Sequence, residues 1–333
     1  MASVTPRRRT GVWRNGRLAA SNGDEGAGDQ SGMSALRATT DSGTSAQSNA
    51  ASTRIGVHAQ VRGATHDPGV SRSAAESANG RASESASDWR NSSRSTVPTI
   101  SVVIPTLNEA KNLPHVLREL PVEVSEVVLV DGCSTDGTVE VAREHYPDIR
   151  IVGQTGRGKG NALACGFKAA RGEVIVMLDA DGSADPAEIS RFVEALTKGA
   201  DFAKGSRFLD GGGSSDLTRV RRLGNAFLVA MVNLLYGTRY SDLCYGYNAF
   251  WADCLSHIAV DCDGFEVETL INIRIAKAGL CVAEVPSFER DRLYGDSNLR
   301  PFRDGFRILR TIFRELSTSA KRLERAPASS RVT

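Results

Sequence analysis

The 333-residue sequence has no apolar run of the about 18 residues that a membrane-spanning helix needs. Its longest apolar stretch, 226–236, is interrupted by Asn233. The six cysteines form no C-x-x-C pair and no metal-ligand spacing, which indicates reduced thiols in a cytosolic protein. No apolar segment follows the arginines at 7–9, so we expect no secretory signal.

Residues 1–98 are poor in the side chains that build a core. Trp13 and Trp89 are their only aromatic residues, and Ser, Gly, Ala, Thr and Arg dominate the rest. Such a segment buries too little apolar surface to offset the entropy lost on ordering. We therefore expect a disordered tail over 1–98, one domain over 99–320, and a flexible C-terminus over 321–333.

The folded part lacks an excess of basic residues. Residues 99–289 carry 18 Lys and Arg against 26 Asp and Glu, whereas residues 290–333 carry 11 against 5. An acidic body argues against nucleic-acid binding, which needs a basic face. The basic C-terminal segment suits a phosphorylated ligand or an anionic membrane surface.

Short apolar segments alternate with segments of helical pattern, which predicts an α/β domain with a mostly parallel central sheet. Its ligands are expected at the carboxyl ends of the strands. Strands are expected at 100–105, 127–130, 149–152, 174–178, 201–204, 246–251 and 281–285. Helices are expected at 109–120, 134–146, 160–170, 186–198, 220–236, 265–278 and 302–317.

The sharpest local pattern is Asp179-Ala180-Asp181-Gly182 at the end of the expected strand 174–178. Alternate residues of a strand point to opposite faces, so two such carboxylates converge only where the strand has turned. Gly182 can supply that turn. Two converging carboxylates repel each other, and a divalent cation with oxygen ligands removes the repulsion.

A glycine-rich loop precedes the expected helix that ends near 170. Gly153 to Lys159 fits the first part of a phosphate-binding P-loop, but Gly160 stands where the P-loop Ser or Thr would bind Mg²⁺. This argues against a nucleotide hydrolase. It leaves a loop in which a basic side chain and backbone amides can approach a diphosphate.

Four segments in order resemble the family 2 glycosyltransferases, whose GT-A fold is Rossmann-like. They are Val102 to Glu109, Val130 to Thr138, Gly158 to Ala162 and Leu178 to Gly182. Within that family the sequence is similar to the polyprenyl-phosphate sugar transferases of the dolichol-phosphate mannose synthase type. The resemblance covers about residues 100–315.

The resemblance implies roles for individual residues. It implies that Asp179 and Asp181 bind Mg²⁺ or Mn²⁺ together with the donor diphosphate, and that Arg207 contacts phosphate. The other implied donor-binding residues are Pro105, Asn108, Glu109, Asp131, Asp136 and Lys159. For Asp131 and Asp136 the resemblance implies either contact with the base or a role in holding the loop. Further candidates for phosphate contact, including the acceptor phosphate, are Arg219, Arg221, Arg222, Arg290 and Arg292.

The acceptor group can be either a phosphate or a hydroxyl, and the sequence leaves both alternatives open. A phosphate acceptor is already ionised at pH 7, whereas a hydroxyl acceptor needs a general base. Asp242, Glu266 and Glu268 are the candidate bases. The resemblance favours a polyprenyl phosphate, and a nucleotidyltransferase is a more distant alternative that would release pyrophosphate.

We therefore expect an inverting, metal-dependent glycosyltransferase that moves a hexose from a UDP- or GDP-sugar to a polyprenyl phosphate. The expected location is the cytoplasm, at the inner face of the membrane. Phenylalanines and arginines alternate at helical spacing within 302–317. Such a basic amphipathic helix can lie on an anionic bilayer or pack its apolar stripe on the domain.

Overall fold

The computed structural model describes residues 57–58, 94–295 and 299–325. Most of the expected N-terminal tail, and residues 326–333 of the expected flexible C-terminus, lie outside the described residues.

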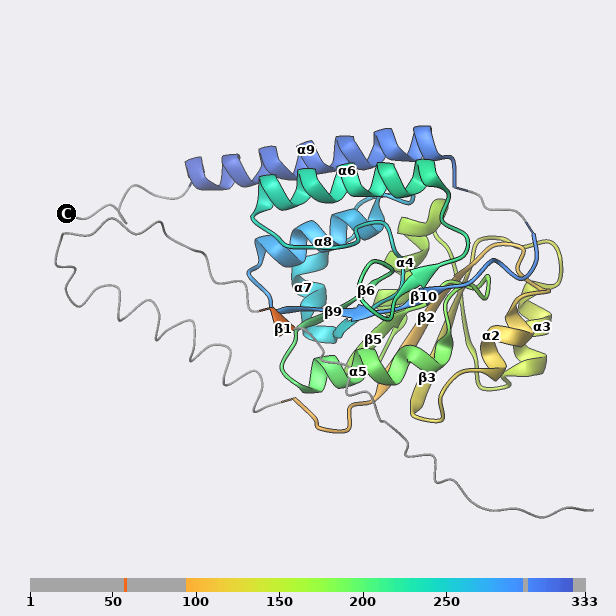
Figure 1. The fold of residues 1–333 in the computed structure, drawn as a ribbon. Coiled ribbons are helices and arrows are strands. Elements are labelled where there is room, and N and C mark those ends of the chain that lie inside the picture. Colours follow the sequence, from red (N-terminus) through yellow and green to blue (C-terminus); the bar gives the residue numbers. More distant parts are fainter. Residues whose placement is uncertain (1–56, 59–93, 296–298, 326–333) are drawn as a thin grey trace, which may run out of the picture. The chain divides into compact units, whose positions relative to one another are not determined.

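An eight-stranded sheet forms the centre of the fold, in the order β1-β9-β6-β8-β5-β2-β3-β4 (Figure 1). Its strands are β1 (Val57–His58), β2 (Ile100–Thr106), β3 (Val124–Asp131), β4 (Arg150–Gly153), β5 (Val174–Met177), β6 (Phe202–Ser206), β8 (Asn248–Trp251) and β9 (Val282–Pro286). A second, two-stranded sheet pairs β7 (Gly213–Ser214) with β10 (Phe288–Glu289).

The pairing confirms a mostly parallel α/β sheet. Strands β5, β2, β3 and β4 run parallel, with Val103 opposite Val128 and Met177. Strands β6 and β9 are also parallel, whereas β8 lies antiparallel between β5 and β6. The carboxyl ends of β2 and β5 therefore meet at one edge, because parallel strands end on the same side.

The helices begin within a few residues of their expected positions, except for the short helix α7, which was not expected. They are α2 (Leu113–Arg118), α3 (Thr138–His145), α4 (Gly158–Ala169), α5 (Ile189–Thr197), α6 (Arg219–Tyr236), α7 (Leu255–Ile258), α8 (Val267–Lys277) and α9 (Pro301–Arg325). Short 3₁₀ turns at Pro186–Glu188 and Ala252–Cys254 precede α5 and α7. Helix α9 continues to Arg325, past the expected end at 317.

Helix α4 approaches the sheet closely. A Cβ on Gly166 would lie 2.3 Å from the Cγ1 of Val103, so a larger residue would push α4 away from β2. Helix α4 packs on both β2 and β3.

Helices α6 and α9 lie side by side in Figure 1, and α9 also packs on α8. The hydroxyl of Tyr236 in α6 donates a hydrogen bond to the carbonyl of Ile312 in α9. None of the helices in the described part of the chain is both long and apolar enough to cross a membrane.

Ordered contacts begin before the expected boundary at residue 99. The guanidinium of Arg94 lies 2.8 Å from Asp201 and 2.9 Å from Asp253, above the ring of Trp251. Farther upstream, Val57 pairs with Ala283 in β9. Part of the segment expected to be a tail therefore contacts the domain.

Candidate active site

A cavity of about 730 Å³ opens at the carboxyl ends of β2 and β5. Its walls come from the first turn of α4, the loop after β5, the first half of α6, the first residues of α8 and the start of α9. The volume lies within the range of small-molecule sites, and the position is the one at which open α/β sheets bind ligands.

The acidic turn lies in this cavity as the sequence predicts. Strand β5 ends at Met177, and Gly182 adopts a φ of +75° that allows the chain to turn after Asp181. The backbone N–H of Ser183 donates to a carboxylate oxygen of Asp181 at 3.0 Å, which fixes the turn. Both carboxylates, Asp179 and Asp181, line the cavity.

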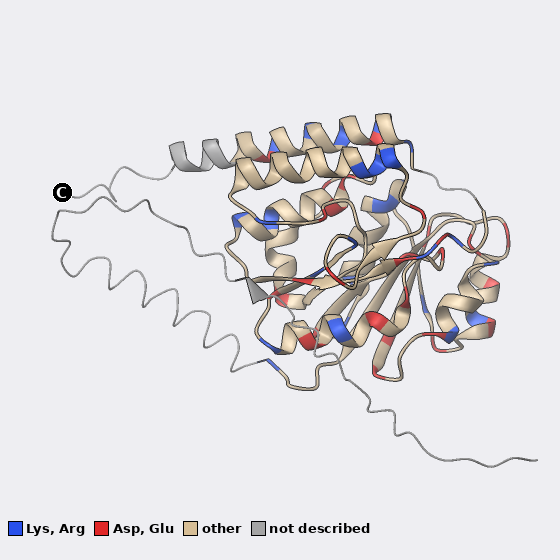
Figure 2. Cartoon of the chain, in the orientation of Figure 1, with Lys and Arg blue, Asp and Glu red and all other residues tan. Residues whose placement is uncertain are grey.

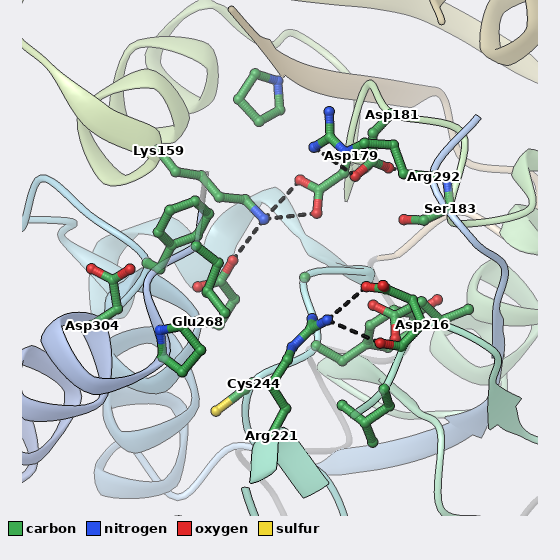
Figure 3. A pocket seen from close by; sticks show the side chains of 18 of the residues that line it. Lys159, Asp179, Asp181, Ser183, Asp216, Arg221, Cys244, Glu268, Arg292 and Asp304 are labelled. Atoms are coloured by element: carbon green, nitrogen blue, oxygen red, sulfur yellow. Dashed lines mark hydrogen bonds and ion pairs between the residues drawn. The ribbon is translucent and has the colours of Figure 1, made fainter. Parts of the chain in front are cut away.

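Lys159 lies between two carboxylates from distant parts of the chain (Figure 3). Its ammonium is 2.7 Å from an oxygen of Asp179 and 2.7 Å from an oxygen of Glu268. Burial alone would lower the pKa of Lys159, but the two carboxylates outweigh it and raise that pKa. Burial also raises the pKa of Glu268, against the attraction of Lys159.

Arg292 holds the second carboxylate of the acidic turn. Its guanidinium lies 3.1 Å from Asp181 and 2.8 Å from Glu109, so it joins the ends of β5 and β2 (Figure 3). The backbone of its segment also binds the turn, because the N–H of Leu293 donates to the carbonyl of Asp181 at 3.2 Å. Each carboxylate of the pair therefore has a cationic partner.

The side chains at the acidic turn fit the coordination of Mg²⁺ or Mn²⁺ only in part. Among the described residues no group of three or more His, Cys, Asp or Glu side chains is placed to hold a metal. Two carboxylates suit a magnesium ion that completes its coordination with water and substrate phosphates. Lys159 and Arg292 occupy the positions next to these carboxylates, so a metal would have to compete with both.

Three expected donor-binding residues hold loops together and do not line the cavity. Asp131 accepts the N–H groups of Cys133 and Ser134, at 3.1 and 3.2 Å, and Asn108 accepts the N–H of Thr135 at 2.9 Å. Asp136 accepts the N–H of Ala110 at 3.0 Å. The bonds of Asn108 and Asp136 join the loop after β2 to the loop after β3, whereas those of Asp131 lie within the loop after β3.

The remaining expected donor residues, Pro105, Glu109 and Lys159, line the cavity directly. Their positions follow from the sequence. Pro105 and Glu109 lie at and just after the carboxyl end of β2, and Lys159 lies in the first turn of α4.

Gly158 and Gly160, in the first turn of α4, lie very close to the backbone of the 262–264 loop. A Cβ on Gly158 would lie 2.0 Å from the carbonyl oxygen of Asp263, and one on Gly160 would lie 2.2 Å from that of Cys262. The N–H of Gly160 donates to the Asp263 carbonyl at 3.0 Å. The backbone amide of Gly160 therefore binds the 262–264 loop, and the lack of a side chain at both glycines allows this close approach.

Each of the three candidate bases is paired with a cation. Asp242 is fully buried outside the cavity lining, and the guanidinium of Arg207 lies 2.7 Å from it. Glu266 lies 3.1 Å from Arg307 and also outside the lining, and Glu268 faces the cavity but binds Lys159. Burial would raise the pKa of Asp242, but its hydrogen bonds and attraction to Arg207 lower it.

Arg207, expected to contact phosphate, is buried in internal contacts. Besides Asp242 it binds Glu289 at 3.0 Å, and its guanidinium lies over the ring of Tyr245 at 4.9 Å. Arg207 borders the cavity, but the carboxylates of Asp242 and Glu289 compete with any ligand phosphate for the N–H groups of its guanidinium.

The structure separates the candidate phosphate-binding arginines. Arg221 and Arg292 line the cavity, whereas Arg219, Arg222 and Arg290 lie outside the lining. Arg221 binds Asp216 at 2.6 Å, and Figure 3 shows both side chains at the wall opposite Lys159. Asp216 did not emerge from the sequence, because it lies in a loop without a recognisable motif.

A Rossmann-like sheet that carries an Asp-x-Asp turn at a strand end defines a class of sugar-transferring enzymes, and the comparison with known proteins agrees. Residues 101–258 match the family described as glycosyl transferase family 2, and the chain belongs to this family. It is therefore a glycosyltransferase, as the sequence predicts.

Of the following three relatives, the second and the third carry names that support the resemblance to polyprenyl-phosphate sugar transferases. Glycosyltransferase AglJ of Haloferax volcanii is 31% identical over 227 residues, which are 67% of this chain and 74% of the relative. The undecaprenyl-phosphate mannosyltransferase of Micrococcus luteus is 31% identical over 60% of this chain and 87% of its own. The polyprenol monophosphomannose synthase of Mycolicibacterium smegmatis is 34% identical over 60% of this chain and 80% of the relative.

A solved structure supports the fold. Glucosyl-3-phosphoglycerate synthase from Mycobacterium tuberculosis, in complex with Mn²⁺, UDP and glucosyl-3-phosphoglycerate, has a TM-score of 0.54. It is 23% identical over 66% of this chain and 80% of that chain. This similarity confirms the GT-A-like architecture.

Proposed function

We propose that this glycosyltransferase moves a hexose from a UDP- or GDP-sugar to a polyprenyl phosphate, with inversion at the anomeric carbon. The names of the Micrococcus and Mycolicibacterium relatives support the acceptor. The cavity has room for a nucleotide sugar, and its position beyond β2 and β5 supports binding of the donor there.

Asp179 and Asp181 would hold the Mg²⁺ or Mn²⁺ ion, which supplies a Lewis acid that stabilises the leaving nucleoside diphosphate. Lys159 adds a fixed positive charge beside Asp179. Because Arg292 binds Asp181 and Glu109, it would shift its contacts when the donor enters, and its guanidinium suits the donor phosphates.

One observation carries the choice of a phosphate acceptor: Asp242, Glu266 and Glu268 are each bound to a cation. A carboxylate held in this way is a poor general base, because accepting a proton would break its ion pair. A phosphate acceptor needs no base. Arg221, which also binds Asp216, lines the cavity from α6, and this position supports Arg221 as the residue that binds the acceptor phosphate.

The outer face of α6 and α9 supports contact with a membrane. Phe302, Phe306 and Phe313 of α9 are 87%, 71% and 55% exposed, and Leu223 and Phe227 of α6 are 74% and 56% exposed. Figure 2 shows Lys and Arg along α9 and at the start of α6. Apolar side chains beside cations suit a helix pair that lies on an anionic bilayer, here the inner face of the membrane.

Product release tests this function. The protein is incubated with Mg²⁺ or Mn²⁺, with each of several UDP- and GDP-sugars, and with a short polyprenyl phosphate or buffer. We expect nucleoside diphosphate to appear only with the lipid phosphate, and to fall at least a hundredfold in Asp181→Asn, because that change weakens stabilisation of the leaving group. The matched control is Asp148→Asn, an exposed residue between α3 and β4.

Three results would contradict the proposal in different ways. Release of pyrophosphate would indicate nucleotidyl transfer. Release without lipid but with a sugar hydroxyl would indicate a hydroxyl acceptor. Full activity in the presence of a chelator would exclude the role assigned to the metal.

A further inference from the structure

A second, smaller cavity of about 280 Å³ adjoins the candidate active site on the far side of Lys159. It lies between the first turn of α4, the 263–265 loop and the first two turns of α9. Its lining residues are Arg157, Gly158, Lys159, Asp263, Gly264, Phe265, Arg300, Arg303, Asp304 and Arg307.

The fold brings these arginines together from two distant segments. Arg157 immediately precedes α4, and Arg300 immediately precedes α9. Arg303 and Arg307 are four residues apart on α9, so their side chains share one face of the helix. Two helices begin at this cavity, and the positive ends of their dipoles add to the charge of the side chains.

Some of this positive charge is already compensated, and some is not. Lys159 binds Asp179 and Glu268, and Arg307 binds Glu266. Asp304 accepts the backbone N–H of Arg300 at 2.7 Å.

Within the described residues the guanidinium groups of Arg157, Arg300 and Arg303 have no ion-pair partner, although Asp263 also lines the cavity. Three arginine side chains are therefore available to a ligand. A planar guanidinium offers paired donors that match the oxygens of a phosphate.

We propose that this cavity binds the phosphate of an anionic membrane lipid, separately from the acceptor phosphate at Arg221. Phe302 and Phe306, which are 87% and 71% exposed, flank Arg303 along α9. A phosphate bound by Arg303 would thus lie next to side chains suited to the acyl region, as lipid headgroups do. The inference that this phosphate belongs to a lipid rests on the membrane contact in the proposed function.

Vesicle binding by the full chain tests the site. Partition is measured on phosphatidylcholine vesicles with increasing phosphatidylglycerol. Arg157→Gln and Arg303→Gln are compared with Arg310→Gln, which removes the same charge from α9 outside the cavity. We expect the two site variants to bind about tenfold or more weakly. Arg310→Gln should weaken vesicle binding at most about fivefold, through the loss of one positive charge near the membrane.

Arg157 gives the sharper comparison, because it lies on the loop before α4 and not on the amphipathic helix. Wild-type binding by Arg157→Gln would overturn the proposal. So would a loss in Arg310→Gln as large as that in Arg303→Gln.

Soluble phosphate distinguishes the source of the ligand. We expect millimolar glycerol phosphate to reduce the phosphatidylglycerol-dependent binding of the wild type but not the residual binding of Arg303→Gln. Tight binding of glycerol phosphate without any preference for anionic vesicles would overturn the lipid assignment. Sugar transfer by the wild type is assayed in parallel, so that a failure of the proposed function is seen separately from a failure of this site.

Discussion

At the scale of single residues, the site depends on a close approach of backbone to charged side chains. Gly246 lies beside the Lys159 ion pairs, where an added Cβ would be 2.7 Å from the Lys159 ammonium and 2.9 Å from Asp179. Any side chain at this position must displace at least one of the two groups. Gly246 therefore leaves the space that the paired side chains of Lys159 and Asp179 occupy, without supplying a functional group itself.

We expect Gly246→Ala to lower the rate of sugar transfer about tenfold to hundredfold, because small displacements of positioned groups have effects of that size. Steady-state kinetics check the rate, and thermal unfolding checks that the fold persists. The control is Gly153→Ala at the end of β4, where an added Cβ meets nothing within 4 Å. Equal rates in the two variants would show that the position of Lys159 does not matter.

A second residue-scale prediction concerns neighbouring arginines of α6. Arg221 lines the cavity, whereas Arg222 is exposed and stacks over Phe208 at 5.6 Å. If Arg221 binds the acceptor phosphate, Arg221→Gln should raise the KM for polyprenyl phosphate about tenfold or more, as expected for loss of a charged hydrogen bond.

The matched control Arg222→Gln should change this KM less than about twofold. The KM for the nucleotide sugar should stay constant in both variants. An equal rise in the acceptor KM for both variants would indicate general attraction by the positive start of α6.

At the scale of elements, α9 is held on α8 by a buried charge cluster. The side chain of Glu315 is 3% exposed and lies 2.8 Å from Arg274 and 2.9 Å from Lys277. Burial alone would raise the pKa of Glu315, but these two cations lower it below its ordinary value of 4.5. The cluster therefore favours the ionised carboxylate and the docked helix.

We expect Glu315→Gln to lower the free energy of unfolding by about 2 kcal/mol at pH 7. Because the folded pKa of Glu315 is lowered, its contribution is present above pH 4.5 and is lost as the pH falls through the folded value. The difference between wild type and variant should accordingly shrink below pH 4.5.

Denaturant unfolding at several pH values measures this difference. Glu194→Gln removes an exposed partner of Lys198 and should cost at most about 0.5 kcal/mol. A difference between wild type and Glu315→Gln that stays constant down to pH 3 would exclude ionisation of Glu315 as its cause.

At the scale of the whole domain, the proposed function assigns contact with the lipid acceptor to the exposed face of α6 and α9. Replacing both Phe302 and Phe306 by Ser should weaken binding to phosphatidylcholine–phosphatidylglycerol vesicles at least tenfold, since burial of one such ring contributes about 1.5–3 kcal/mol. Cosedimentation with vesicles measures the change.

Val122→Ser is the control for this surface. Val122 is 97% exposed but precedes β3, at the amino-terminal edge of the sheet, whereas α6 and α9 close the cavity at the carboxyl edge. We expect wild-type vesicle binding from this variant. A loss as large as that of the phenylalanine variant would mean that apolar exposure alone governs the binding.

The sequence alone determined the order of the longer strands and helices and the place of the acidic turn, whereas the short elements β1, β7, β10 and α7 were not predicted. Continuous runs of Val, Ile and Leu, such as 102–104 and 127–130, are a local signal, because a buried parallel strand must be apolar on both faces. Asp179 and Asp181 follow such a run directly, so their location at the carboxyl edge followed from the same local pattern.

Only the tertiary structure decided which charged residues meet. Lys159 binds Glu268, more than a hundred residues away, and Arg292 joins Asp181 to Glu109. Ion pairs across such separations depend on how elements pack and leave no periodic trace in the sequence. For the same reason the sequence could offer Asp242, Glu266 and Glu268 as bases but could not reveal the cation beside each one.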